Sequence, residues 1–432
     1  MAGAHPGCRR SGDSGIKEAS LTASGMEKEG MRILVVPKEF PHGRVIGGPI
    51  IIYNRIKYLS RHHRIGLASF IRDEERKYLG TIEPYLSELE LMPYPPPRNM
   101  FRRTSDFFFS EVPPYMCNTK SSEMRRTVAE MTQRSSYDVV IAEYSVMGQY
   151  LYKNPGINSR TKRILSCHEC YTIARKKVRD LYGIFSTKGL RAMLDLYRLE
   201  VYEFAMYREM DKIITLTPEE REGLLRYTPD LDIDVVPHGV DTERFSPVSP
   251  GQQEMSVAFL GNYPHDPNRD AVMYFIKEIW PHLKKTFPDV KFYVIGRDPT
   301  LDILTAAEKD PNIVVTGTVE DVRDYLKRAR VFVAPIRLGK GFRGKILEAM
   351  AMAIPVVTTS LGAEGIPVED MSNIVIADDT ETFVERIARL LKDEDLYGRV
   401  SRGARTLVEK RFSWEKGVQI LEHVLEKTVV KG

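Results

Sequence analysis

Residues 335–350 read PIRLGKGFRGKILEAM, directly after the apolar run VFVA at 331–334. The apolar run is typical of a strand buried on both faces, and the residues from Ile346 onward are typical of the first turns of a buried helix. The stretch is therefore a strand, a glycine-rich basic loop and a helix start. In an open parallel α/β sheet such a loop lies at the carboxyl edge, where free backbone N–H groups and the positive end of the helix dipole bind an anion.

Charged side chains in this stretch fit a phosphorylated ligand. Lys340, Arg343 and Lys345 supply positive charge suited to phosphate. Glu348, one turn into the helix, can accept hydrogen bonds from a pair of ribose or sugar hydroxyls. On these residues alone a second interpretation stays open, a basic surface loop before an ordinary helix with Glu348 in solvent.

The same alternation of strands and helices runs along the chain. Strands are expected at residues 31–37, 65–70, 138–142, 163–166, 211–217, 233–236, 256–260, 290–295, 313–316, 331–334, 356–359 and 373–377. Helices are expected at residues 50–61, 124–131, 190–207, from 218 onward, and at 271–286, 319–329, 380–392 and 396–411. A chain of 432 residues is too long for one core. The pattern predicts an α/β protein of two doubly wound, Rossmann-like domains joined near residue 248, with ligand loops facing a cleft.

Composition limits the class of protein. The hydrophobic fraction of 42% and the charged fraction of 28% are those of a globular protein. A net charge of +4 is small for this length, so we expect no nucleic-acid partner. Residues 1–30 lack the apolar core of a signal peptide, and no apolar run approaches the roughly 20 residues of a membrane span. We expect a disordered tail, Met26 or Met31 as an alternative start, and a cytoplasmic protein.

Two short motifs resemble metal or redox sites. Cys167 and Cys170 form a C-x-x-C, but Cys8 and Cys117 offer no second one, so a reduced, partly buried pair is the preferred interpretation. Residues 230–234 read DLDID and contain two D-x-D patterns, far in sequence from every phosphate candidate. We therefore expect no metal site.

Two further positions follow strands and could face a ligand. Gly47 and Gly48 open the helix after the first strand, as a phosphate- or sugar-facing loop or as a plain strand-to-helix turn. His168 directly follows the strand at 163–166, which places it at the carboxyl edge of the sheet. A single histidine is otherwise more often a structural residue.

Several of these motifs together resemble glycosyltransferase family 4. Residues 343–351 match its donor-binding signature R-x-K-x-L-E-A-M-A, and residues 355–358 (PVVT) and 362–365 (GAEG) continue the likeness. The Ala363-Glu364-Gly365 ending is similar to the polysaccharide-biosynthesis branch. Weaker matches are the Gly47-Gly48 loop, His168, residues 237–241 (PHGVD), the Gly261 loop and residues 412–414 (FSW).

The resemblance covers residues 31–428 and implies the GT-B fold. Its organisation would be a tail at 1–30, an N-terminal acceptor-side Rossmann-like domain at 31–244 and a linker at 245–254. A C-terminal nucleotide-sugar-binding Rossmann-like domain would occupy 255–411, and the helix at 412–432 would return to the N-terminal domain.

The resemblance also implies a chemistry, metal-independent sugar transfer with retention of configuration from a nucleoside-diphosphate sugar (NDP-sugar). The NDP-sugar is a co-substrate, no cofactor is expected, and the acceptor is a glycan, a lipid-linked sugar or a small molecule. His168 is implied as the catalytic residue at the sugar. The implied donor-binding residues are Gly47, Gly48, Gly261, Lys340, Gly341, Phe342, Arg343, Gly344, Lys345, Ile346 and Glu348.

One departure from the family keeps other hypotheses open. Many relatives carry two glutamates eight positions apart, and here Lys340 stands where the partner of Glu348 would be. A basic donor contact is therefore expected, with Arg343 and Lys345 at the diphosphate. The alternatives are a non-catalytic nucleotide-sugar-binding or scaffolding protein and a UDP-sugar 2-epimerase.

Residues 98–109 combine arginines with Phe101, Phe107, Phe108 and Phe109 between proline-rich ends. They suggest either a contact with the cytoplasmic membrane or a lipid-linked acceptor, or aromatic packing onto the N-terminal domain.

Overall fold

A computed structural model describes residues 30–43, 48–99, 105–106, 110–182, 187–248, 253–338 and 344–430. Among the predicted features, most of the tail and residues Gly47, Lys340, Gly341, Phe342 and Arg343 lie outside these ranges.

The described residues of the first half form a sheet of seven parallel strands in the order β3-β2-β1-β4-β5-β6-β7. The strands are β1 (Arg32–Pro37), β2 (Arg64–Ile71), β3 (Glu88–Pro93), β4 (Val139–Glu143), β5 (Lys162–Cys167), β6 (Lys212–Thr215) and β7 (Ile233–Val235). The helices are α1 (Gly48–Leu59), α3 (Ser122–Ser135), α4 (Tyr171–Tyr182), α5 (Thr187–Arg208) and α6 (Pro218–Leu225), with short 3₁₀ turns η1 (Asp73–Thr81), η2 (Glu83–Tyr85), η3 (Cys117–Thr119) and η4 (Ser145–Tyr150).

In the second half, the described residues form a parallel sheet of six strands in the order β10-β9-β8-β11-β12-β13. The strands are β8 (Ser256–Asn262), β9 (Lys291–Arg297), β10 (Ile313–Gly317), β11 (Val331–Ala334), β12 (Val356–Thr358) and β13 (Val375–Ile376). The helices are α7 (Asp266–Tyr274), the π turn η5 (Phe275–Ile279), α8 (Trp280–Thr286), α9 (Leu301–Lys309), α10 (Arg323–Leu326), α11 (Gly344–Ala351), α12 (Thr380–Lys392), α13 (Glu394–Arg411) and α14 (Trp414–Val430).

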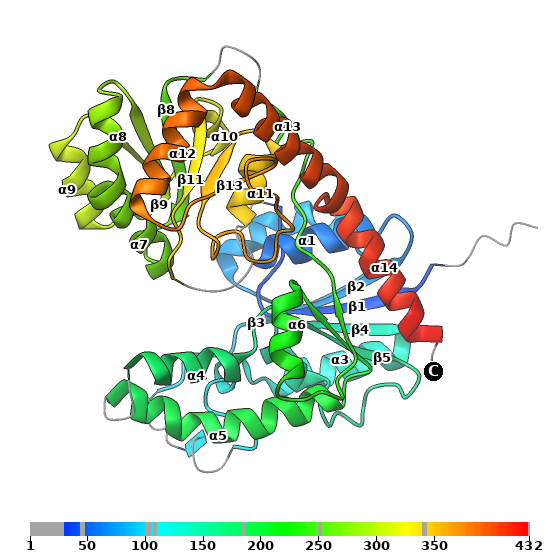
Figure 1. The fold of residues 1–432 in the computed structure, drawn as a ribbon. Coiled ribbons are helices and arrows are strands. Elements are labelled where there is room, and N and C mark those ends of the chain that lie inside the picture. Colours follow the sequence, from blue (N-terminus) through cyan, green and yellow to red (C-terminus); the bar gives the residue numbers. More distant parts are fainter. Residues whose placement is uncertain are drawn as a thin grey trace, which may run out of the picture.

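Alternation along β1 explains why helices cover both faces of the first sheet. Leu34 and Val36 pack in one core with α3, whereas Ile33 and Val35 pack in another with α1. The core that contains α1 also holds apolar side chains of α14, from the far end of the chain. In Figure 1 the first sheet lies below the second, and α14 runs down one side from the upper half to the lower.

One predicted helix is wrong in extent. Of residues 319–329 only α10, Arg323–Leu326, is helical. The Asp321 carboxylate accepts from the Arg323 backbone N–H at 3.0 Å and from its guanidinium. This local side-chain bonding competes with helical hydrogen bonds, so the helix starts only after it.

The elements β3, α4 and α9 are not among the predicted ones. None of the helices in the described ranges combines the length and apolar character needed to cross a membrane.

Candidate functional site

The carboxyl ends of β4 and β5 bring Glu143 and His168 together. The two strands are parallel, with Glu143 in register with Ser166, so the residue after β5 lies beside the end of β4. The His168 Nε2 atom is 2.8 Å from Glu143 Oε2, and both side chains are buried. The structure therefore places His168 at the carboxyl edge of the sheet, with a carboxylate as its partner.

Arg55 of α1 completes this buried cluster. Its Nη1 lies 3.0 and 3.2 Å from the two carboxylate oxygens of Glu143 and 2.8 Å from Ser166 Oγ. Arg55 is 4% exposed and Glu143 is 2% exposed. Burial alone raises the pKa of Glu143, but Arg55, His168 and Ser166 overcome it and bring that pKa down to about 2. Glu143 is therefore ionised at neutral pH.

Tyr144 links this cluster to the first turn of α1. Its ring stacks on His168 with centroids 4.2 Å apart, and its backbone φ is +78°, a strained value for a bulky residue. A Cβ atom at Gly48 would lie 1.5 Å from the Tyr144 hydroxyl oxygen. Gly48 thus lets the Tyr144 ring, which stacks on His168, approach the first turn of α1.

Glu203 of α5 holds the two loops that carry Tyr144 and His168. Its fully buried carboxylate accepts from the Ser145 hydroxyl at 2.6 Å and from the backbone N–H groups of Tyr171 and Thr172 at 3.0 and 2.7 Å. Because those two N–H groups open α4, Glu203 caps that helix from a neighbouring element.

In the second half, α11 carries four of the predicted donor residues, Gly344, Lys345, Ile346 and Glu348, and β8 carries Gly261. Lys345 Nζ donates to Asn268 Oδ1 at 2.6 Å and lies 4.5 Å from the centre of the Phe259 ring. A Cβ at Gly261 would lie 3.1 Å from Phe259 and 3.2 Å from Asn268. The structure therefore brings Gly261 and Lys345 together at the carboxyl edge of the second sheet.

Glu348 and Ile346 of the same helix have different surroundings. Desolvation raises the pKa of Glu348, and the charges of Lys345 and Arg244 oppose this rise. Ile346 is fully buried in the core, so only its backbone can contact a ligand.

Two other basic residues near this edge are paired with carboxylates. Arg269 binds Asp302 at 2.9 Å, and Arg337 binds Asp270 at 2.8 Å. Both guanidinium groups are therefore bound to carboxylates within the second half of the chain.

His238 is where the two halves meet. It follows β7, its ring centre is 5.2 Å from that of Trp414 in α14, and a Cβ at Gly344 would lie 3.5 Å from it. Burial lowers the pKa of His238 to about 3, and the charge of Arg55 adds to the effect against a backbone hydrogen bond at Gly239. A neutral imidazole thus packs against Trp414 and beside the first residue of α11.

The two metal-like motifs have structural partners. Lys212 pairs with Asp234 at 2.8 Å and also with Asp232, so the D-x-D carboxylates bind a lysine. Cys167 and Cys170 are free, buried thiols whose pKa values burial raises. Over the described ranges, no group of three or more His, Cys, Asp or Glu side chains could hold a metal ion.

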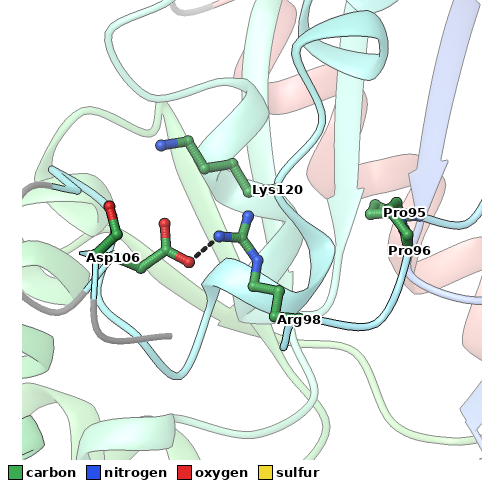
Figure 2. Close-up of a pocket in the computed structure, with 6 residues that line it drawn as sticks. Pro95, Pro96, Arg98, Asp106 and Lys120 are labelled. Carbon is green, nitrogen blue, oxygen red and sulfur yellow. Dashed lines mark hydrogen bonds and ion pairs between the residues drawn. The ribbon is translucent and has the colours of Figure 1, made fainter. Parts of the chain in front are cut away.

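A separate cavity of about 310 Å³ lies beyond the end of β3. Figure 2 shows Arg98 reaching toward Asp106, with which it forms an ion pair, and Lys120 beside them. The cavity shares no lining residue with the His168 cluster. Of the predicted basic and aromatic stretch, Phe101 and Phe107 to Phe109 lie outside the described residues.

Arg55 and Glu143 are not among the predicted site residues, although the sequence carries a signal for each. Arg55 is three residues after Ile52 and four before Leu59, so it is a charge on the apolar face of α1. Glu143 is a carboxylate at the end of a buried apolar strand. A charge in such a position needs a partner, which only the fold identifies.

Comparison with known proteins adds an independent line of observation. A family model described as "Glycosyltransferase Family 4" matches residues 50–244, and one described as "Glycosyl transferases group 1" matches residues 254–393. Together the two matches span most of the chain.

Individual relatives are distant but cover much of the chain. Over 406 residues it is 21% identical to an uncharacterized 44.6 kDa protein in the cps region of Klebsiella pneumoniae, covering 89% of this chain and 97% of that protein. It is 22% identical over 243 residues to the Escherichia coli UDP-Gal:alpha-D-GlcNAc-diphosphoundecaprenol alpha-1,3-galactosyltransferase, covering 51% of this chain and 61% of that protein. The structure of Anabaena HepE in complex with UDP superimposes with a TM-score of 0.64 at 14% identity, covering 92% of this chain and all of HepE.

Proposed function

This chain belongs to glycosyltransferase family 4 and has the GT-B fold, and from that premise we propose that it transfers a sugar from an NDP-sugar to a glycan or lipid-linked acceptor with retention of configuration. The observation that carries the proposal is the position of α11. The first residue of α11 lies against His238. His238 in turn lies near Arg55 and His168 of the first half. A donor at the start of α11 would therefore lie between the two halves.

The donor's diphosphate suits the start of α11. Free N–H groups and the helix dipole favour an anion there, and Lys345 adds a positive charge in the first turn. Glu348, one turn on, would accept hydrogen bonds from the ribose hydroxyls. Fixed positive charge of this kind stabilises a leaving diphosphate without a metal ion.

The proposed transfer needs no protein base. The acceptor hydroxyl attacks the anomeric carbon from the face of the leaving group, its C–O bond forms as the bond to the diphosphate oxygen breaks, and its proton passes to that oxygen. His168 and the Gly48 end of α1 would line the sugar and acceptor side. Closure of the two halves would exclude water and limit hydrolysis.

We expect Glu348→Gln to weaken donor binding while stabilising the ligand-free protein. A hydrogen bond to a charged group contributes about 1.5–3 kcal/mol, so nucleotide affinity should fall about 10- to 150-fold. Because desolvation raises the pKa of Glu348 in the folded state, its ionisation opposes folding as pH rises above the ordinary value of 4.5. At neutral pH the glutamine variant should therefore unfold at a higher temperature without ligand.

The measurement is a thermal-shift screen of UDP-, GDP-, ADP-, dTDP- and CMP-sugars. A donor at 100 times its dissociation constant should add about 2.7 kcal/mol of stability to the wild type. Glu385→Gln, at an exposed position of α12, is the matched control and should change neither quantity. A wild type that no nucleotide sugar stabilises would contradict the proposed donor site. Stabilisation without turnover for any acceptor would favour a scaffolding role.

For the acceptor, we propose a lipid-linked sugar at the membrane surface. The E. coli relative is named for a diphosphoundecaprenol acceptor, and residues 98–109 are basic and aromatic. Replacing Phe107, Phe108 and Phe109 together by serine is expected to reduce flotation with anionic liposomes several-fold, because aromatic rings contribute most of the apolar insertion. Equal flotation of variant and wild type would rule out this contact.

A further inference from the structure

Among the residues that the structure describes, the contacts of His168 leave one ring nitrogen for a ligand. Nε2 lies 2.8 Å from Glu143 Oε2, and an ionised carboxylate can only accept, so Nε2 carries the proton and donates it. Tyr144 covers one face of the ring, with centroids 4.2 Å apart. In the neutral tautomer that this bond selects, Nδ1 is a hydrogen-bond acceptor.

Burying the pair of Arg55 and Glu143 carries a large desolvation cost. Both side chains are nearly fully buried, and desolvating two charges offsets most of their attraction. Moreover, the Nη2 of Arg55 is buried without a hydrogen-bond partner within the described structure. A donor left unpaired in this way costs free energy, which indicates a role in function.

We propose that Glu143 and Arg55 are positioning residues for the transfer, acting through His168. Glu143 fixes the tautomer and orientation of the imidazole, so that Nδ1 accepts a hydrogen bond from a sugar hydroxyl in the site. Arg55 holds Glu143 ionised and in place. This inference rests on the proposed function, because it names how the sugar side of that site is built.

A double-mutant cycle on Glu143→Gln and His168→Ala tests the proposal. The assay measures release of nucleoside diphosphate from the nucleotide sugar that gives the largest thermal shift, per folded molecule. Removing an orienting group commonly costs about 10- to 100-fold, so we expect that loss in kcat/KM for Glu143→Gln. The double variant should be no slower than His168→Ala alone, because Glu143 acts only through that ring. Losses that multiply would overturn the proposal.

A second variant separates positioning from folding. Arg55→Met with Glu143→Leu removes both charges, and such apolar replacements commonly preserve stability. We expect a folded protein with the same loss of kcat/KM. Wild-type activity in that variant would overturn the proposal. The control is Lys212→Met, which breaks the ion pairs between the buried Lys212 and the half-exposed Asp232 and Asp234 of the same sheet, away from His168, and should leave kcat/KM unchanged.

Nitrogen NMR of the His168 ring tests the inference even if no turnover is found. The wild type should show a proton on Nε2 only, assigned by its absence in His168→Ala, whereas Glu143→Leu should show a mixture of tautomers. An unchanged tautomer in Glu143→Leu would overturn the proposal. Failure of the proposed function would instead appear as a wild type without any nucleotide-dependent thermal shift.

Discussion

Gly296→Ala is expected to destabilise the second half of the protein by about 4 kcal/mol or more, an exceptional loss for one substitution. Gly296 has a backbone φ of +129°, which is strained for any residue with a side chain. A Cβ there would also lie 1.9 Å from the carbonyl oxygen of Gly261, on the paired strand β8. Neither atom can move without separating β8 from β9, at the edge where Lys345 and Asn268 meet.

The measurement is urea unfolding followed by the fluorescence of Trp280, which is buried in the second half. The chain has two tryptophans, so a Trp414→Phe background makes the signal specific. Gly317→Ala is the control for strain alone, because Gly317 has φ +65° and a Cβ there would meet no atom within 4 Å, and it should cost about 1–2 kcal/mol. Gly80→Ala, with open space and ordinary φ, should be nearly neutral. Equal losses for Gly296 and Gly317 would show that the close strand approach contributes nothing.

Glu203→Gln is expected to cost about 2–4 kcal/mol, because an amide replaces one acceptor oxygen with a donor. The carboxylate accepts six hydrogen bonds, from Ser145, Cys170, Tyr171, Tyr207 and two groups of Thr172. At least one of these donors would face the new N–H₂ group. The first residue of α4 is Tyr171, two residues after Glu169. Losing a hydrogen bond from Glu203 to this helix start should therefore also make the position of His168 less fixed.

Hydrogen exchange of the Tyr171 and Thr172 backbone amides measures the loss of their hydrogen bonds to Glu203. Both amides should exchange faster in Glu203→Gln than in the wild type. The matched control is Glu200→Gln, one turn earlier on α5. Glu200 also bridges to α4, through Lys176 at 2.8 Å, but its side chain is 36% exposed and should contribute less than about 1 kcal/mol. Unchanged exchange at the two amides would contradict the capping role of Glu203.

Local sequence determined most of the repeating structure. The apolar run at residues 331–334 forms a buried parallel strand, because its side chains fit a sheet covered on both faces. The start of the helix predicted from residue 218 onward is also set locally. The Thr217 hydroxyl accepts from the Glu220 backbone N–H at 3.2 Å, and Pro218 occupies the first helical position. The motif at residues 343–351, followed by those at 355–358 and 362–365, indicated the family, because this match is nearly contiguous in the chain.

Tertiary structure alone decided which charges meet. Arg55 and Glu143 are 88 residues apart, and the packing of His238 against Gly344 joins the two halves of the chain. Periodicity shows that Arg55 faces the core, but the identity of its partner depends on the order of strands in the sheet. The same limit applies to the predicted helix at 319–329, where the Asp321 side chain redirected the backbone. Patterns within about one helical turn are set by the chain itself, whereas contacts across a sheet are set by which strands become neighbours.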